Sequence, residues 1–309
     1  MPPITLLEDV HEMGRMLYYN GAIMPEEEVR ISPLDHGFLY GDGIFEGIRA
    51  YAGRIFRLED HLDRLYQSAK SLLLTIRETQ SEMTEALKAT VAANQLQDAY
   101  IRLVVSRGPG DLGLDPRQCP EPTVIIIADR IQLFPEAFYE SGLALATAAS
   151  RRPSGDVLNP QIKSLNYLNS VLAKIEAAQR GVPEMVLLNQ LGHVVEGTGD
   201  NVFIVRRGTI VTPPRSAGIL PGITRAVVME LAEGLGIRVS EENFTVHELY
   251  NAEECFLTGT AAEIIAAVSC DGRMIGDGTP GPITRALRTH FMEYAATHGT
   301  AVYPGVSVI

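Results

Sequence analysis

Lys163 is the first residue whose type and setting could do chemistry. It lies in NPQIKSLNYLNSVLAK, residues 159–174, where a polar run gives way to apolar residues at steps of three and four: Leu165, Leu168, Leu172 and Ile175. This spacing predicts a helix with a buried face that begins near Lys163. A lysine with a lowered pKa can form a Schiff base with a carbonyl or act as a general base, and a helix N-terminus disfavours a neighbouring cation. The ordinary alternative is a surface lysine, so other residues must decide.

Glu196 and Tyr167 could serve the same site. Glu196 ends a predicted strand in HVVEGTGDNVFIV, where the chain turns sharply. An acid fixed there could face the protonated ring nitrogen of a pyridine cofactor. It could also be a solvated turn residue, which is the role that we expect for Asp200. Tyr167 follows Lys163 by four residues, so on a helix its phenol would reach what the lysine reaches.

Three segments could bind a phosphate group. In GILPGITR, a Pro-Gly turn is followed by Ile223 and Thr224, which open a helix with free backbone N–H groups, and such a helix start binds anions. A second cluster of hydroxyl and amide groups lies in FLTGTAAEI, at Thr258, Gly259, Thr260 and Ala261. Arg64, in DHLDRL, could add a bidentate contact, or it could pair with Asp60 on the helix surface. Each signal alone is weak.

Cations and aromatic rings on predicted strands could recognise a substrate. Tyr100 and Arg102 alternate in AYIRLVV and therefore share a face. An arginine on a buried face needs a carboxylate partner, unless that face of the sheet is wet. Arg49 in FEGIRAY raises the same question, as do the aromatic residues Phe45 and Tyr40.

The predicted elements that must position these residues differ between the first and second parts of the chain. Residues 1–130 alternate predicted strands and helices, including a hairpin at Ala52-Gly53 and a helix with Asp60 as its expected N-cap. Residues 131–142 are the predicted linker. Residues 143–309 combine strands joined by tight turns with helices, two of them near residues 224–235 and 283–299. The sequence therefore predicts an α+β fold with a smaller N-terminal α/β domain and a larger C-terminal domain rich in antiparallel sheet.

Composition excludes several classes of function. The chain has 309 residues, of which 46% are hydrophobic, enough for one large domain or two ordinary ones. Its net charge of −12 disfavours nucleic acid and anionic membranes as partners. Three separated cysteines, and the lack of HExxH and GxSxG motifs, argue against a metal site and a serine nucleophile. The N-terminus does not look like a secretion signal, and no segment has the length of a membrane span, so we expect a soluble, cytoplasmic protein.

Taken in order along the chain, these motifs resemble the class IV aminotransferase family, the fold-type-IV enzymes that use pyridoxal 5′-phosphate, and most closely its branched-chain amino-acid aminotransferases. The matching segments span nearly the whole chain: YYNGAIMPEEEVRISPLDHGFLYGDGIFEGIRAY, DHLDRL, YIR, KSLNYLN, EGTGDNVFIV, LPGITR, LTGTAAEI and PGPITRAL. The resemblance implies transfer of amino groups from leucine, isoleucine and valine to 2-oxoglutarate, in branched-chain amino-acid biosynthesis. It also implies a homodimer or a higher assembly of dimers.

The resemblance implies a role for each residue. Lys163 would bind the cofactor covalently and shuttle a proton, Glu196 would keep the ring nitrogen protonated, and Tyr167 would hydrogen-bond the phenolate oxygen. The phosphate would be bound by Arg64, Ile223, Thr224 and Thr260. The substrate's α-carboxylate would be bound by Tyr100 and by the turn amides of Thr260 and Ala261. The distal carboxylate of glutamate would be bound by Arg102, aided by Tyr40 and Arg49, and the side-chain pocket would be lined by Phe45 and Gly47.

Three other interpretations share the fold or the motifs. A D-amino-acid aminotransferase would present the opposite face of the substrate. A lyase of the aminodeoxychorismate type would release pyruvate and would need Arg102 less. A non-catalytic relative would be attractive only without Lys163 or Glu196, and both are present. FEGIRAY and AYIR resemble the L-branched-chain group better than these alternatives.

Overall fold

A computed structural model of the chain describes residues 14–303. Helices make up 32% of it and strands 30%, as expected for the α+β class. Contacts divide the chain into two compact units, and each is described by itself. The first unit contains the residues up to Ile131, Lys163–Asn166 and those from Thr297, and the second contains Gln132–Ile162 and Tyr167–Ala296. Residues 131–142 include helix α4 (Glu136–Ser141), and the domain limits read from the sequence stay a prediction.

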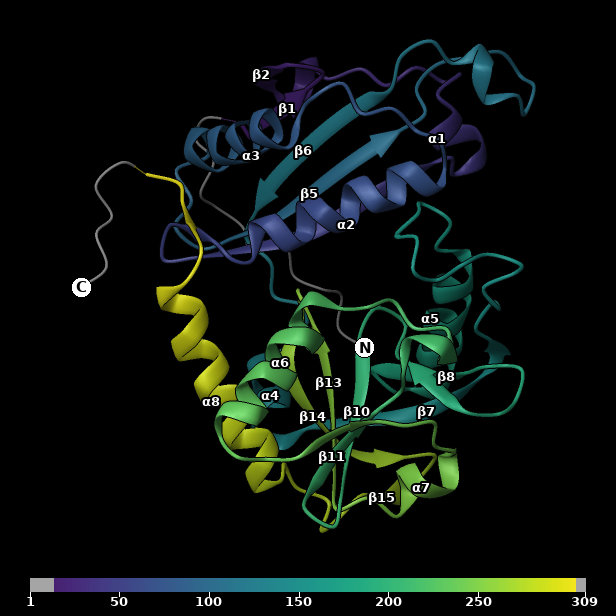
Figure 1. Cartoon of the computed structure of the whole chain (residues 1–309), viewed down its shortest axis with the longest axis vertical. Coiled ribbons are helices and arrows are strands. Elements are labelled where there is room, and N and C mark those ends of the chain that lie inside the picture. Colours follow the sequence, from purple (N-terminus) through teal and green to yellow (C-terminus); the bar gives the residue numbers. More distant parts are fainter. Residues whose placement is uncertain (1–13, 304–309) are drawn as a thin grey trace. The chain divides into compact units, whose positions relative to one another are not determined.

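The first unit is built on an antiparallel sheet, which has seven strands among the described residues in the order β16-β4-β3-β5-β6-β1-β2. Figure 1 shows β5 and β6 side by side in this sheet. The strands are β1 (Met16–Tyr19), β2 (Ala22–Pro25), β3 (Gly43–Tyr51), β4 (Arg54–Ile55), β5 (Ala99–Ser106), β6 (Thr123–Asp129) and β16 (Thr300–Ala301). In the β3–β5 pair, Gly47 lies opposite Arg102. Directly opposed residues share a face, so Phe45 and Gly47 lie on the face of Arg102, and Glu46 lies on the other.

The helices of the first unit are α1 (His36–Tyr40), α2 (Leu58–Ser71) and α3 (Gln80–Ala93). The hairpin predicted at Ala52-Gly53 is confirmed, because β3 and β4 pair across it and both residues have positive φ angles. The predicted N-cap of α2 is wrong. The helix begins two residues before Asp60, which lies in its first turn and pairs with Arg57, where a carboxylate favours the helix dipole.

The second unit is built on a mixed sheet that closes into a barrel. Within residues 14–303 its main path runs β12-β11-β10-β13-β14-β7-β8-β9, β9 also pairs with β10, and β15 joins β14 at the side. The strands are β7 (Leu143–Arg151), β8 (Glu184–Leu188), β9 (Val194–Glu196), β10 (Asn201–Arg206), β11 (Thr209–Thr212), β12 (Val239–Glu241), β13 (Glu254–Gly259), β14 (Glu263–Cys270) and β15 (Arg273–Met274). A closed sheet leaves fewer unpaired strand edges, and its interior must be filled by side chains.

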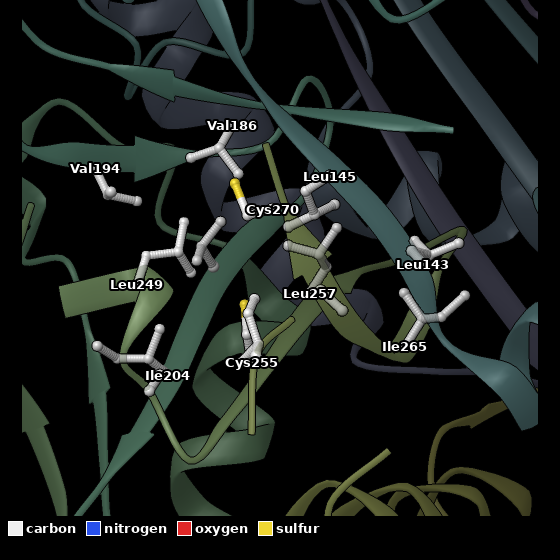
Figure 2. Close-up of a cluster of buried hydrophobic side chains, with 14 of the residues drawn as sticks. Leu143, Leu145, Val186, Val194, Ile204, Leu249, Cys255, Leu257, Ile265 and Cys270 are labelled. Carbon is white, nitrogen blue, oxygen red and sulfur yellow. The ribbon is translucent and has the colours of Figure 1, made fainter. Parts of the chain in front are cut away.

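That interior is apolar, as Figure 2 shows. Side chains from most of the barrel strands meet there, among them Leu143, Val186, Val194, Ile204, Leu257 and Ile265. Fully burying each such aliphatic side chain contributes about 1.5–3 kcal/mol. Cys255 and Cys270 lie in the same core as free thiols, and burial raises the pKa of Cys255 well above its usual value. A raised pKa favours the thiol over the more reactive thiolate.

Besides α4, the later helices are α5 (Leu168–Arg180), α6 (Ile223–Gly234), α7 (Val246–Tyr250) and α8 (Pro282–Thr297) (Figure 1). Within residues 14–303, every helix is too short or too polar to cross a membrane. The helix predicted to begin near Lys163 instead begins at Leu168. The prediction that its apolar face is buried is also wrong, because Leu168, Leu172 and Ile175 are 68%, 46% and 49% exposed. The buried face carries the small residues Ser170, Ala173 and Ala177, which let the helix approach the barrel closely.

Candidate active site

Lys163 lies in an extended segment of the first unit rather than at a helix start. Its carbonyl accepts the Phe45 N–H at 2.9 Å, and the Leu165 N–H donates to the Gly43 carbonyl at 2.9 Å. These bonds place the segment beside β3 as an added strand-like edge. The Lys163 N–H also donates to the Ser68 Oγ at 3.3 Å. Backbone bonds on both sides therefore fix the base of the lysine, and the helix-dipole argument for its chemistry does not hold.

The side chain of Lys163 extends over an aromatic ring that also contacts a guanidinium. Lys163 Nζ lies 4.6 Å from the centre of the Phe45 ring, and Arg102 Cζ lies 4.6 Å from the same centre. Arg102 Nη2 donates to the Tyr100 Oη at 2.9 Å. The partner found for Arg102 is thus a phenol and a ring face rather than the carboxylate that a buried arginine was expected to need. The first unit brings together an amine, an apolar ring and a cation.

Gly47 completes this face. A Cβ added to Gly47 would lie 2.3 Å from the Tyr100 Oη, so the absence of a side chain lets the phenol cross the strand. Arg49, two residues on, places its Cζ 5.2 Å from the centre of the Tyr51 ring. Tyr40 is 37% exposed and donates its hydroxyl hydrogen to the Leu112 carbonyl at 2.6 Å. Neither of these contacts tests a role beside Arg102, so the roles of Arg49 and Tyr40 stay predictions.

Arg64 pairs with a buried carboxylate on the opposite face of β3. Its Nε and Nη2 donate to the two oxygens of Glu46 at 2.8 and 2.7 Å. His61 Nδ1 lies 2.8 Å from Glu46 Oε2. Burial alone would raise the pKa of Glu46, but the charge and hydrogen bonds of Arg64, with a smaller contribution from His61, hold that pKa at about 2. The alternative of a surface arginine paired with Asp60 is wrong, because Arg64 is 9% exposed.

Glu196 is a buried acid in the second unit, anchored at both oxygens. As predicted, it is the last residue of a strand, β9. Its Oε2 accepts the Leu220 N–H at 3.0 Å and the Asn201 Nδ2 at 3.3 Å, and its Oε1 lies 2.7 Å from Arg152 Nη2. A carboxylate held by a cation and two N–H donors keeps its charge and its orientation. Asp200, expected to be solvated, is instead only 6% exposed.

The start of α6 is tied to this acid. Asn201 Nδ2 donates to the Leu220 carbonyl at 2.9 Å, and a Cβ on Gly222 would lie 2.0 Å from Asn201 Oδ1. Gly222 is the N-cap of the 12-residue helix α6 and, as a glycine, has no side chain to accept a hydrogen bond. The backbone N–H groups of the first turn, near Ile223 and Thr224, therefore receive no cap from this residue. Such a start favours an anion.

A buried hydroxyl in the same row of the barrel supports a ligand site. Thr258 lies opposite Asn201, which lies opposite Glu196, so the three side chains share a face. Thr258 is 1% exposed, and its Oγ1 has no hydrogen-bond partner among the described residues. A buried hydroxyl without a partner is costly, and a bound polar group would remove that cost. Within the second unit, an anchored acid suits a protonated ring nitrogen and a helix start suits a phosphate, two groups that a pyridine cofactor carries.

Three predicted residues occupy turns and helix ends. Tyr167 is the residue before α5, so it does not lie one helical turn beyond Lys163 as expected. Thr260 and Ala261 lie in the turn between β13 and β14, where a Cβ on Gly259 would lie 2.2 Å from Asp200 Oδ1. The second unit thus ties Glu196, through the Leu220 N–H, to the segment that leads into α6. The contacts of Tyr167, Thr260 and Ala261 with a ligand stay predictions.

The sequence reasoning missed the partners of the predicted residues. Glu46 and His61 fix Arg64, and Arg152 and Asn201 fix Glu196. Two signals were present: a carboxylate in the middle of the apolar strand GIFEGI, and an asparagine at the start of the apolar strand NVFIV. A polar residue within an apolar strand is usually buried and hydrogen-bonded, so its presence predicts a partner elsewhere in the chain. No such signal marks Arg152, because it lies in a polar run.

Comparisons with known proteins identify the family. The class IV amino-transferase family matches residues 43–270. A Methanocaldococcus jannaschii protein, whose name as a branched-chain-amino-acid aminotransferase is provisional, is 52% identical over 93% of this chain and 99% of its own. The branched-chain-amino-acid aminotransferase of Escherichia coli K12 is 34% identical over 89% of this chain and 91% of its own.

Solved structures give the same result. The crystal structure of a branched-chain amino acid aminotransferase from T.th., complexed with N-(5′-phosphopyridoxyl)-L-glutamate, has a TM-score of 0.87 and 38% identity, covering 92% of this chain and 94% of that chain. The Escherichia coli enzyme has a TM-score of 0.90 and 31% identity, covering 96% of this chain and 98% of that one. The fold-type-IV expectation is therefore confirmed, and the chain belongs to the class IV aminotransferase family.

Proposed function

We propose that the protein catalyses the pyridoxal-5′-phosphate-dependent transamination of L-leucine, L-isoleucine and L-valine with 2-oxoglutarate, giving branched-chain 2-oxo acids and L-glutamate. One observation carries the proposal. The Phe45 ring lies 4.6 Å from both Lys163 Nζ and Arg102 Cζ. A substrate that reaches the Lys163 amine therefore meets an apolar ring, which suits a branched side chain, and a guanidinium, which suits the distal carboxylate of glutamate.

Each residue has a distinct task in this mechanism. Pyridoxal 5′-phosphate, when bound, supplies an aldehyde that accepts the amino group and a ring that stores the electron pair released at the substrate Cα. Lys163 would hold the cofactor covalently and would move the proton at that carbon. Glu196 would stabilise a proton on the ring nitrogen, because Arg152, Asn201 and the Leu220 N–H fix the carboxylate in place.

The remaining predicted residues bind and orient. Tyr167 would donate to the phenolate oxygen of the cofactor. The phosphate would be bound by Arg64, Ile223, Thr224 and Thr260. The α-carboxylate of the substrate would be bound by Tyr100, Thr260 and Ala261. The distal carboxylate would be bound by Arg102 with Tyr40 and Arg49, and the branched side chain would lie against Phe45 and Gly47.

We also propose that the chain forms a homodimer through α5. Leu168, Val171, Leu172 and Ile175 recur at helical spacing on α5, and each is at least 46% exposed. Single exposed apolar residues are ordinary, but a contiguous apolar stripe on one helix is typical of an interaction surface. A second copy is the occupant that we favour, because a stripe presented by every copy can face itself across a twofold axis. The cytoplasmic location expected from the sequence stays a prediction.

The test starts with the reactive amine. Borohydride reduction of the protein with bound pyridoxal 5′-phosphate, followed by peptide mapping, should recover a pyridoxyl adduct on Lys163. Purified protein should then convert L-leucine and 2-oxoglutarate to the 2-oxo acid and glutamate, and Lys163→Ala should abolish this turnover. An adduct on another lysine would overturn the assignment. Turnover of D-alanine but not of L-leucine would instead identify a D-amino-acid aminotransferase.

A further inference from the structure

We propose that Glu46 and His61 are positioning residues that orient Arg64, so that the chain selects the phosphorylated form of its cofactor through side chains that do not touch the phosphate. The inference rests on the proposed function, in which Arg64 binds that phosphate. It gives a role to Glu46 and His61, to which the sequence motifs assigned none: affinity for one chemical group of the cofactor.

The geometry of the Glu46–Arg64 pair is the first observation. Glu46 is 0% exposed, and its two oxygens accept from Nε and Nη2 of the same guanidinium. Two parallel bonds to one edge fix both the position and the plane of that group. A buried ion pair is weak evidence for stability, because apolar residues of similar volume often serve as well. Orientation of the guanidinium is a task that apolar residues cannot perform.

His61 fixes the carboxylate in turn. It is 2% exposed, and its Nδ1 lies 2.8 Å from Glu46 Oε2. Burial lowers the pKa of His61 more than the Glu46 charge raises it, so the ring is neutral and its Nδ1–H donates to the carboxylate. Glu46 is therefore held from two directions, by Arg64 and by His61, and cannot rotate away from the guanidinium without losing a buried hydrogen bond.

One face of α2 carries this group and a contact to the reactive lysine. His61, Arg64 and Ser68 follow one another at steps of three and four along the helix, so they lie on the same face. Ser68 Oγ accepts the Lys163 N–H at 3.3 Å. The same helix face thus supports both Arg64 and the backbone of Lys163, which ties the proposed phosphate contact to the proposed covalent linkage.

The experiment compares two ligands that differ only in the phosphate. Full-length protein, stripped of its cofactor, is titrated with pyridoxal 5′-phosphate and separately with pyridoxal, and binding is followed by absorbance. We expect Glu46→Gln and His61→Leu to weaken the binding of pyridoxal 5′-phosphate by about tenfold to a hundredfold. Pyridoxal binding should change by less than about twofold, because that ligand never uses Arg64. His61→Asn, which can keep an N–H donor near Glu46, should retain most of the affinity.

A double-mutant cycle separates positioning from general damage. In an Arg64→Ala background, Glu46→Gln should cause no further loss of pyridoxal 5′-phosphate affinity, because the group that it orients is gone. Equal losses for the two ligands, or an additive cycle, would overturn the inference. If Glu46→Gln does not fold, the His61→Leu and His61→Asn pair decides in the same way. Borohydride labelling of Lys163 in each variant shows separately whether the proposed function stands.

Discussion

A carboxylate that stabilises a proton on a bound ring must keep its own charge and must not turn away. Glu196 meets both demands, because Arg152 Nη2 lies 2.7 Å from one oxygen and the Leu220 N–H donates to the other. We predict that Glu196→Gln keeps the borohydride-trapped adduct on Lys163 but lowers turnover with L-leucine by at least about 10²-fold. The measurement is steady-state kinetics beside adduct mapping, and Glu196→Asp is the control that keeps the charge.

We make a separate prediction for Arg152, which acts on the reaction through Glu196. Arg152→Gln removes the cation from the acid while leaving hydrogen-bonding capacity, and we expect turnover to fall by about tenfold to a hundredfold, as for other residues that orient a functional group. Cofactor affinity should fall less than turnover. If Arg152→Gln lowers activity only through a lower melting temperature, measured on the same preparation, Arg152 has a structural role and the prediction is wrong.

The buried pair of His61 and Glu46 predicts how stability depends on pH. The folded-state pKa of His61 is lowered from 6.5, chiefly by burial. Below about pH 6.5 the unfolded chain therefore binds a proton at His61 more readily than the folded chain does, and the free energy of unfolding decreases as the pH is lowered. The pKa of Glu46 is lowered from 4.5 to about 2, so its contribution is present above pH 4.5 and is lost as the pH approaches 2.

Urea unfolding of wild type and His61→Asn between about pH 8 and pH 5 tests the first part of this behaviour. The wild type should lose unfolding free energy more steeply than the variant as the pH falls through the region of 6.5, since asparagine does not titrate. Parallel curves for the two proteins would show that His61 is protonated in the folded state as readily as in the unfolded one, contrary to its burial.

At the scale of single elements, our most specific prediction concerns the packing of Gly47 in β3 against Tyr100. The Gly47 φ lies outside the positive region, so alanine fits the backbone. The cost of Gly47→Ala arises where its Cβ meets Tyr100, at 2.3 Å from Oη and 3.0 Å from Cζ. Overpacking of this kind costs about 1–3 kcal/mol. We expect a raised KM for the amino acid, because Tyr100 and Arg102 move. Adding Tyr100→Phe removes the hydroxyl that makes the shortest contact and should restore part of the stability lost in the single variant, because the ring carbons stay close to the new Cβ.

The sequence predicted elements better than it predicted what those elements contact. The hairpin at Ala52-Gly53 and the helix at Thr224 follow from local rules about glycine and apolar spacing, and both are present. The helix predicted near Lys163 was displaced, because the chain first pairs with β3, a contact with residues more than a hundred positions earlier. Apolar spacing on α5 revealed a helix but could not show whether its stripe faces this chain's own core or another surface.

The same limit applies to the site. Lysine, acid and helix start were identified by residue type and setting, whereas their partners were not. Glu46 and Arg64 are separated by 18 positions, and Glu196 and Leu220 by 24, and only a tertiary fold brings such residues together. Residue chemistry therefore predicts which side chains act, and packing decides what holds them in place.

At the scale of the whole molecule, the α5 stripe predicts a concentration-dependent assembly. Leu172→Glu places a charge in a face that we propose is buried against a second copy, so the variant should sediment as a monomer where the wild type is a dimer. Leu191→Glu, at an 80% exposed leucine in the turn between β8 and β9, is the matched control, because it makes the same change of side chain outside α5. A wild type that is monomeric at micromolar concentration would contradict the proposed homodimer.

The ring of strands in the second unit closes where Glu196 pairs with Asn201. The loop of residues 197–200 joins the two strands, and Gly197 N–H donates to the Asp200 carbonyl across it. Inserting or deleting one residue there would turn Asn201 to the other side of its strand. The β9–β10 pairing and the hydrogen bond from Asn201 to Glu196 would then be lost together. Residue identity is constrained as well, because Thr198 and Asp200 are buried and the Thr198 hydroxyl donates to Glu184 at 2.9 Å. Engineering of this loop should therefore keep its length and vary only the exposed Gly199, where an added Cβ would meet nothing within 4 Å.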